Sequence, residues 1–232
     1  MPSNLNIVLV HGAWADGSSW SRVIPLLQDN GCRVAAVQIP LTSLAEDVAI
    51  TRHVLALQTG PSILVGHSYG GAVITEAGTD APDVVGLVYI SAFAPDEGES
   101  IGDLNARASA SGQAHIRTDD RGFLWISQEG FAAAFAQDVD PDEARILAAV
   151  QKPIAAGVFW DKITTPAWKS KPSWCLISEN DRMIPPDTQR FMATRMSATV
   201  LSVRSSHASL VSRPNEVVKL ITDAQHHQDG SD

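Results

Sequence analysis

The fold is decided by residues 62–77, which read SILVGHSYGGAVITEA. Residues 62–65 are typical of a short buried strand, and the small and apolar residues 71–77 are typical of a helix packed closely on a sheet. Gly66 and Gly70 flank Ser68, so a tight turn between strand and helix can hold this serine above the sheet. The pattern G-x-S-x-G occurs by chance in roughly one such chain in ten, so the strand–turn–helix context carries most of the weight.

The rest of the chain alternates short apolar runs with helical patterns. This alternation is typical of an α/β fold with a mostly parallel sheet and helices on both faces. A capping box at Ser43–Glu46 opens one helix, and another is expected from about Trp20 to Asn30 with a kink at Pro25. We predict strands at Ile7–Val10, Arg33–Gln38, Ser62–Val65, Val85–Ser91, Trp174–Ser178 and Thr199–Val203.

One long stretch, residues 95–171, interrupts the alternation. It is longer than a crossover between parallel strands requires, and insertions of this size usually carry lids or binding elements. It contains a possible hairpin around Asp119–Gly122 and two short helices, the second opened by Asp140-Pro141. We therefore expect one domain: a core of residues 1–94 and 172–225, an inserted lid of residues 95–171, and a flexible tail of residues 226–232.

Composition excludes several classes of protein. The 232 residues carry a net charge of −9, which argues against a nucleic-acid partner or an anionic membrane surface. No apolar run approaches the length of a membrane span. Cys32 and Cys175 do not make a disulfide framework, and we expect both to be reduced and buried in a cytoplasmic protein. The oligomeric state stays open.

A serine nucleophile needs a base and an acid, and on this topology the chain order is serine, acid, histidine. His207 follows the last predicted strand and is the expected base, whereas His115 lies in the lid. Asp181, after the strand ending at Ser178, is the expected acid because it can fix the imidazole tautomer. Glu179 and Asp96 are the alternative acids.

The remaining site residues follow from the same reasoning. The backbone N–H groups of Tyr69 and Ala13 are expected to form the oxyanion hole, which stabilises the charge on the reacting carbonyl oxygen. His11, beside Ala13, is expected to brace the loop by hydrogen bonding. Candidate pocket walls are four aromatic residues, Trp14, Trp125, Phe159 and Trp160.

Several segments together resemble the α/β-hydrolases, and most closely the branch that holds plant methylesterases, hydroxynitrile lyases and small bacterial esterases. The segments are VLVHGAW at 8–14, VGHSYGG at 65–71, LVYISAFAPD at 87–96, and those around Asp181 and His207. The resemblance implies an α/β-hydrolase fold with about six mostly parallel strands and no cofactor; no metal is expected either. It also supports Ser68, Asp181 and His207 as the catalytic triad.

Two positions separate esterases from lyases in that branch. In the hydroxynitrile lyases of the branch that this chain resembles, threonine stands where this chain has Gly12, and lysine stands where it has Ala208. Because cyanide leaves as an anion and needs a nearby cation, the resemblance favours an esterase over a lyase. We expect a serine hydrolase acting on a small apolar or aromatic carboxylic ester. Lactone or carbon–carbon cleavage, cofactor-free oxygenation, and a ligand-binding receptor are the alternatives.

Overall fold

The computed structural model describes residues 5–229, and its centre is a six-stranded sheet in which every neighbouring pair is parallel. The spatial order is β2-β1-β3-β4-β8-β9. The strands are β1 (Asn6–Val10), β2 (Arg33–Val37), β3 (Ser62–His67), β4 (Val84–Ile90), β8 (Ser173–Ser178) and β9 (Thr199–Val203). All six predicted strands are therefore confirmed, with ends that shift by one or two residues.

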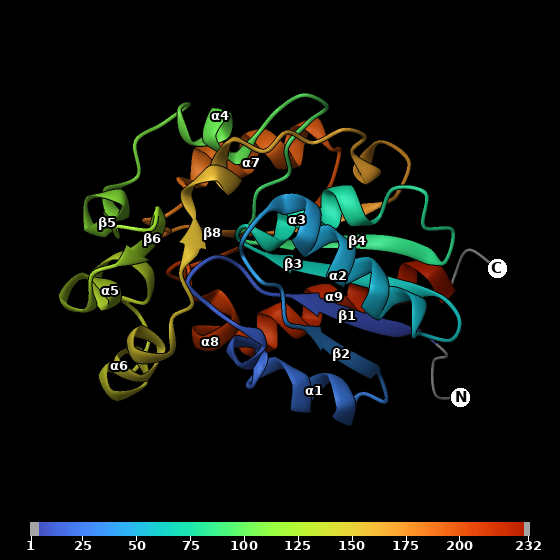
Figure 1. Ribbon diagram of the computed structural model, residues 1–232. Coiled ribbons are helices and arrows are strands. Elements are labelled where there is room, and N and C mark those ends of the chain that lie inside the picture. Colours follow the sequence, from blue (N-terminus) through green and yellow to red (C-terminus); the bar gives the residue numbers. More distant parts are fainter. Residues whose placement is uncertain (1–4, 230–232) are drawn as a thin grey trace.

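Helices cover both faces of this sheet, which explains why the strands are apolar on both sides. Helices α2 and α3 pack together on one face, and α1 and α9 pack together on the other (Figure 1). Helix α7 packs on β8. The core helices are α1 (Val23–Asp29), α2 (Leu44–Ala56), α3 (Gly70–Ala77), α7 (Pro186–Arg195), α8 (Ser209–Ser212) and α9 (Pro214–Asp229), with a 3-10 turn η1 (Gly17–Trp20) before α1.

The lid residues build a second, smaller sheet of order β5-β6-β7, with short helices around it. Strands β5 and β6 pair antiparallel around the expected hairpin, and Asp140 caps α6 through its side chain. The elements are α4 (Ile101–Asn105), η2 (Ser111–His115), β5 (Ile116–Thr118), β6 (Phe123–Ile126), α5 (Gln128–Phe135), α6 (Pro141–Val150), β7 (Ile154–Ala155), η3 (Ala156–Trp160) and η4 (Ala167–Lys169).

The lid lies over the carboxyl ends of the core strands. The indole N–H of Trp14, in the loop after β1, donates to the Leu124 carbonyl of β6 over 2.9 Å. The Ala208 N–H, after β9, donates to the Phe135 carbonyl of α5 over 3.1 Å. In Figure 1, β5, β6, α5 and α6 gather at one end of the large sheet. Side chains that follow the core strands therefore meet beneath the lid.

One local expectation, the kinked helix from Trp20, was wrong. The segment expected as a helix from Trp20 is divided into η1 and α1, and Pro25 lies in the first turn of α1. A proline there lacks only an N–H that has no partner within the helix, so no kink is needed. Helix α9 continues to Asp229, which makes residues 226–229 helical; residues 230–232 of the expected tail lie outside the described residues.

Across residues 5–229, none of the helices is both long enough and apolar enough to span a bilayer.

Candidate active site

Ser68 lies in a strained turn between β3 and α3. Its φ is +54°, in the left-handed region that a non-glycine residue rarely adopts. The turn is held because the Ser68 N–H donates to the Ile90 carbonyl and the Ser68 carbonyl accepts from Phe93 and Gly71. A Cβ on Gly66 would lie 2.5 Å from the Gly70 carbonyl oxygen, so only glycine fits this close approach. The strand–turn–helix geometry predicted for residues 62–77 is present.

His207 joins Ser68 to Asp181. Its Nε2 lies 2.8 Å from Ser68 Oγ, and its Nδ1 lies 2.8 Å from Asp181 Oδ2. With the Nδ1 proton donated to the carboxylate, Nε2 is free to accept the serine proton. The His207 ring packs edge-on against Phe135, with ring centroids 4.8 Å apart. His207 is fully buried, so its orientation is set by these contacts.

Each oxygen of the Asp181 carboxylate accepts two hydrogen bonds. Oδ2 accepts from His207 and also from Gln189 Nε2 at 2.8 Å. Oδ1 accepts from the backbone N–H groups of Met183 at 2.7 Å and Ile184 at 3.0 Å. Four donors replace the water that a buried carboxylate loses, and they leave one oxygen directed at the imidazole.

The alternative acids have other partners. Glu179 pairs with Arg190, and Asp96 Oδ1 lies 2.7 Å from the Lys169 ammonium. Both are half-buried at the edge of the molecule, and their ion pairs direct them away from His207. The other histidine considered, His115, packs closely on Gly130 in the lid. Of the weighed acids and bases, the fold brings together Ser68, His207 and Asp181.

The two expected oxyanion donors both border the space in front of Ser68. Ala13 and Tyr69 line the same pocket as Ser68. Neither backbone N–H donates to an acceptor within residues 5–229. Two unpaired N–H groups beside a nucleophile are the arrangement that an oxyanion needs.

Two buried histidines brace the turn and its neighbouring loop. His11 Nδ1 lies 2.9 Å from the Gly12 carbonyl and its Nε2 accepts from the Ile39 N–H, so His11 ties two loops together as expected. Burial lowers the pKa of His11 to about 4. His67 Nε2 donates to the His207 carbonyl over 2.9 Å, and burial, with His207 nearby, lowers the pKa of His67 well below its usual range. Both rings are therefore neutral supports.

A buried carboxyl group holds the residue after the nucleophile, and sequence reasoning missed it. Asp47, in the first turn of α2, accepts from the Tyr69 hydroxyl at 2.6 Å and from the Leu41 N–H at 2.8 Å. Burial raises the pKa of Asp47 to about 6, against the opposing effect of these hydrogen bonds. In the sequence, Asp47 is recognisable only as an acidic residue in the first turn of a predicted helix. Acidic residues are common at that position, so nothing there indicated a contact with Tyr69.

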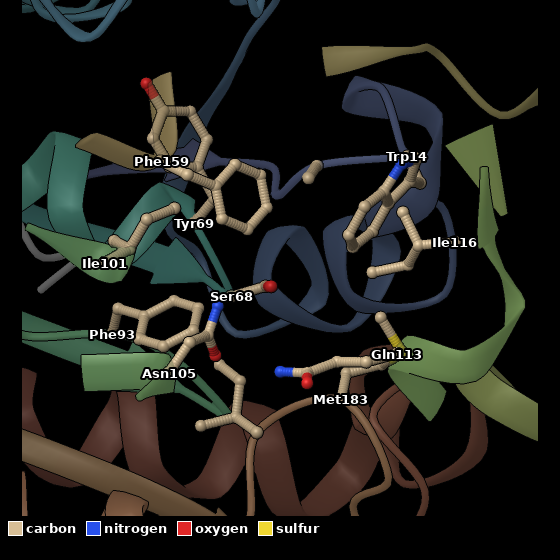
Figure 2. Close-up of a pocket in the computed structure, with 12 residues that line it drawn as sticks. Trp14, Ser68, Tyr69, Phe93, Ile101, Asn105, Gln113, Ile116, Phe159 and Met183 are labelled. Atoms are coloured by element: carbon tan, nitrogen blue, oxygen red, sulfur yellow. The ribbon is translucent and has the colours of Figure 1, made fainter. Parts of the chain in front are cut away.

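A narrow apolar pocket opens onto Ser68 (Figure 2). Trp14 and Phe159 line it as expected, with ring centroids 6.4 Å apart. The remaining lining residues are Ala13, Tyr69, Phe93, Ile101, Asn105, Gln113, Ile116, Met183 and Ile184.

The structure places the other two expected aromatic residues, Trp125 and Trp160, away from the wall of this pocket. The Trp125 indole N–H donates to Asp119 Oδ2 over 3.0 Å, so its ring is held against the turn of its own hairpin. Trp160 is 65% exposed and packs on Gly102 from outside the pocket. No sequence pattern marked most of the other wall residues, among them Asn105 and Gln113. Their distance from Ser68 depends on how the lid folds.

Gly12 has a steric reason to be glycine. A Cβ at this position would lie 2.7 Å from Ser68 Cβ and 3.0 Å from the His67 carbonyl oxygen. A threonine here would require the nucleophile turn to move. Ala208 is fully buried behind the triad and does not line the pocket at Ser68.

Comparisons with known proteins agree with this architecture. The family described as "Alpha/beta hydrolase family" matches residues 7–220. A carbendazim hydrolyzing esterase of Nocardioides sp. (strain SG-4G) is 38% identical over 109 residues, which are 41% of this chain and 45% of that protein. Methylesterase 8 of Arabidopsis thaliana is 31% identical over 105 residues, 39% of each chain. The aligned stretches thus span less than half the length of either relative.

A solved structure extends the likeness over nearly the whole chain. A pyrethroid hydrolase from Sphingobium faniae JZ-2 superposes with a TM-score of 0.83, covering 95% of this chain and 98% of its own, at 24% identity. At 24% sequence identity, this structural likeness shows a shared fold and nothing about the reaction.

Proposed function

Because this chain belongs to the alpha/beta hydrolase family, we propose that it is a serine hydrolase that cleaves a small, neutral carboxylic ester. The observation that carries the proposal is the unbroken hydrogen-bonded relay from Ser68 through His207 to Asp181. Ser68, at one end of this hydrogen-bonded chain, lines an apolar pocket, and the two unpaired N–H groups of Ala13 and Tyr69 lie beside it. The esterase names of the partial relatives support the same reaction class.

The proposed mechanism is acyl transfer. His207 Nε2 removes the proton of Ser68 as its oxygen attacks the ester carbonyl. The negative charge on the carbonyl oxygen is stabilised by the N–H groups of Ala13 and Tyr69. His207 then protonates the departing alcohol, and afterwards removes a proton from water, which releases the acid and restores Ser68. Asp181 keeps the imidazole in the required tautomer throughout.

The pocket limits the substrate. Aromatic and aliphatic side chains form most of its walls, and among residues 5–229 no Asp, Glu, Lys or Arg lines it. A charged substrate group would lose its hydration without gaining a partner, so we expect a neutral ester. Cyanohydrin cleavage is disfavoured, because no lysine occupies position 208 and the Gly12 position leaves no room for a threonine side chain.

The test is hydrolysis of p-nitrophenyl acetate and butyrate by the wild type, Ser68→Ala and His207→Ala. We expect turnover by the wild type and a loss of kcat of at least about a thousandfold in each variant. Because members of a triad act as a unit, the double variant should lose no more than either single variant. Full activity in Ser68→Ala, or no nitrophenol release by the wild type above background, would contradict the proposal.

A further inference from the structure

Two amide side chains stand out in the otherwise apolar pocket. Asn105 is the last residue of α4, and Gln113 belongs to the 3-10 turn η2. Both line the pocket at Ser68. In Figure 2 they enter the view from opposite sides, with Gln113 extended toward Asn105 and Ser68 drawn above them. They are the only carboxamides on the pocket wall within the described part of the chain.

Neither side-chain amide has a hydrogen-bond partner within the described part of the chain. Asn105 Oδ1 is buried, and no group of residues 5–229 donates to it. The Gln113 side chain forms no hydrogen bond with any residue from 5 to 229. A buried amide oxygen without a donor is unfavourable, because it has lost its water and gained nothing in exchange. A polar group left in this state at a binding site points to a ligand that supplies the missing donor.

The backbone holds both amides in place. A capping box between Ser100 and Asp103 starts α4 five residues before Asn105. The Gly112 N–H donates to the Arg182 carbonyl over 2.7 Å, and a Cβ on Gly112 would lie 2.6 Å from Met183 Sδ. The turn that carries Gln113 is thereby tied to the loop after Asp181. A subsite built on fixed backbone can discriminate between ligands.

We propose that Asn105 and Gln113 form a polar subsite that binds an O–H or N–H group on the substrate. This inference rests on the proposed function and narrows its substrate class to neutral esters with an apolar body and one hydrogen-bond donor. The donor satisfies Asn105 Oδ1, and Gln113 supplies either a donor or an acceptor to the same group. A substrate carboxylate or ammonium group is disfavoured, since no side chain of opposite charge from the described part of the chain lines the pocket.

The experiment compares matched esters that differ by one hydroxyl group. For a donor on the acid part, the probes are methyl phenylacetate and its 3- and 4-hydroxy derivatives. For a donor on the alcohol part, they are 2-phenylethyl acetate and its 3- and 4-hydroxyphenyl derivatives. In both series the ring is insulated from the ester, so the hydroxyl changes recognition more than reactivity. Methoxy analogues of each serve as acceptor-only controls.

The wild type should favour at least one hydroxyl ester over its unsubstituted and methoxy partners by about tenfold in kcat/KM. Asn105→Leu and Gln113→Met keep the approximate size of each side chain and remove the amide. Each should lower the ratio of hydroxyl to unsubstituted ester toward one. Gln128→Leu, which removes an exposed amide elsewhere on the lid, is the matched control and should keep the wild-type ratio.

The two proposals can fail separately. Equal kcat/KM for all members of both series, with turnover that still depends on Ser68, would overturn the polar subsite and leave the hydrolase standing. A hydroxyl preference that persists in both Asn105→Leu and Gln113→Met would also overturn it. Hydrolysis of these esters at the same rate by Ser68→Ala would instead contradict the proposed function, and the subsite with it.

Discussion

At the scale of the residue, Asp181 combines two tasks in one carboxylate. One oxygen caps the loop at Met183 and Ile184, and the other accepts from His207 and Gln189. An asparagine can keep the first task, because its oxygen still accepts the backbone N–H groups. Its amino group would then face His207 Nδ1 and favour the tautomer that carries its proton on Nε2, where it cannot accept from serine.

We therefore expect Asp181→Asn to lower kcat by about 10³- to 10⁴-fold while the chain still folds. Asp96→Asn is the matched control, since Asp96 lies on the surface and pairs with Lys169. It should remain within about twofold of the wild type, as is usual for changes to an exposed ion pair. Steady-state kinetics on p-nitrophenyl butyrate, with circular dichroism of each variant, provide the measurement. Equal losses in both variants would argue against Asp181 as the acid.

At the scale of the element, helix α2 supports the active site from behind through Asp47. This side chain is fully buried and bonds the Tyr69 hydroxyl, so α2 sets the position of the residue that follows the nucleophile. The folded state raises the pKa of Asp47 from 3.8 to about 6. The stability that Asp47 contributes is thus complete below about pH 4 and is lost as the pH rises through 6.

An Asp47→Asn variant removes this ionisation and keeps a side chain of the same shape. Between pH 4.5 and 7.5 the wild type should lose roughly 2 kcal/mol of unfolding free energy relative to Asp47→Asn. His11 and His67, whose lowered pKa values act in the opposite direction, are present in both proteins and cancel in the difference. Urea denaturation of both proteins at several pH values measures this difference in unfolding free energy, and Asp29→Asn, at an exposed position, is the control. Parallel pH profiles for wild type and Asp47→Asn would refute the assignment.

At the scale of the whole molecule, the two cysteines report on different parts of the fold. Cys175 lies in β8, between β4 and β9, and burial raises the pKa of its thiol. Cys32 lies directly before the edge strand β2, and its Sγ is 3.4 Å from Gln225 Oε1 on α9. Both thiols are buried. Because Cys32 lies at the sheet edge against α9, we expect its site to open when the end of α9 separates from the core, while Cys175 in the inner strand β8 stays covered.

Thiol labelling should therefore be slow in the native protein and should modify Cys32 before Cys175 at low denaturant concentration. The variants Cys32→Ser and Cys175→Ala isolate the two rates, which can be followed with a chromogenic disulfide reagent. Full denaturation should release both thiols together. Rapid reaction of Cys175 under native conditions would contradict the burial and order described for β8.

The sequence by itself determined the parts of this protein that depend on local periodicity and chain order. Continuous apolar runs predicted the six strands, and glycines at positions 66 and 70 predicted the strained turn at Ser68, because these patterns act through neighbouring residues. Only the tertiary structure decided which carboxylate meets His207, since Asp181 and Glu179 are two residues apart in the chain, yet Asp181 faces His207 and Glu179 pairs with Arg190. It also decided the pocket walls and the support from Asp47, because both depend on how the lid and α2 pack against the carboxyl edge of the sheet.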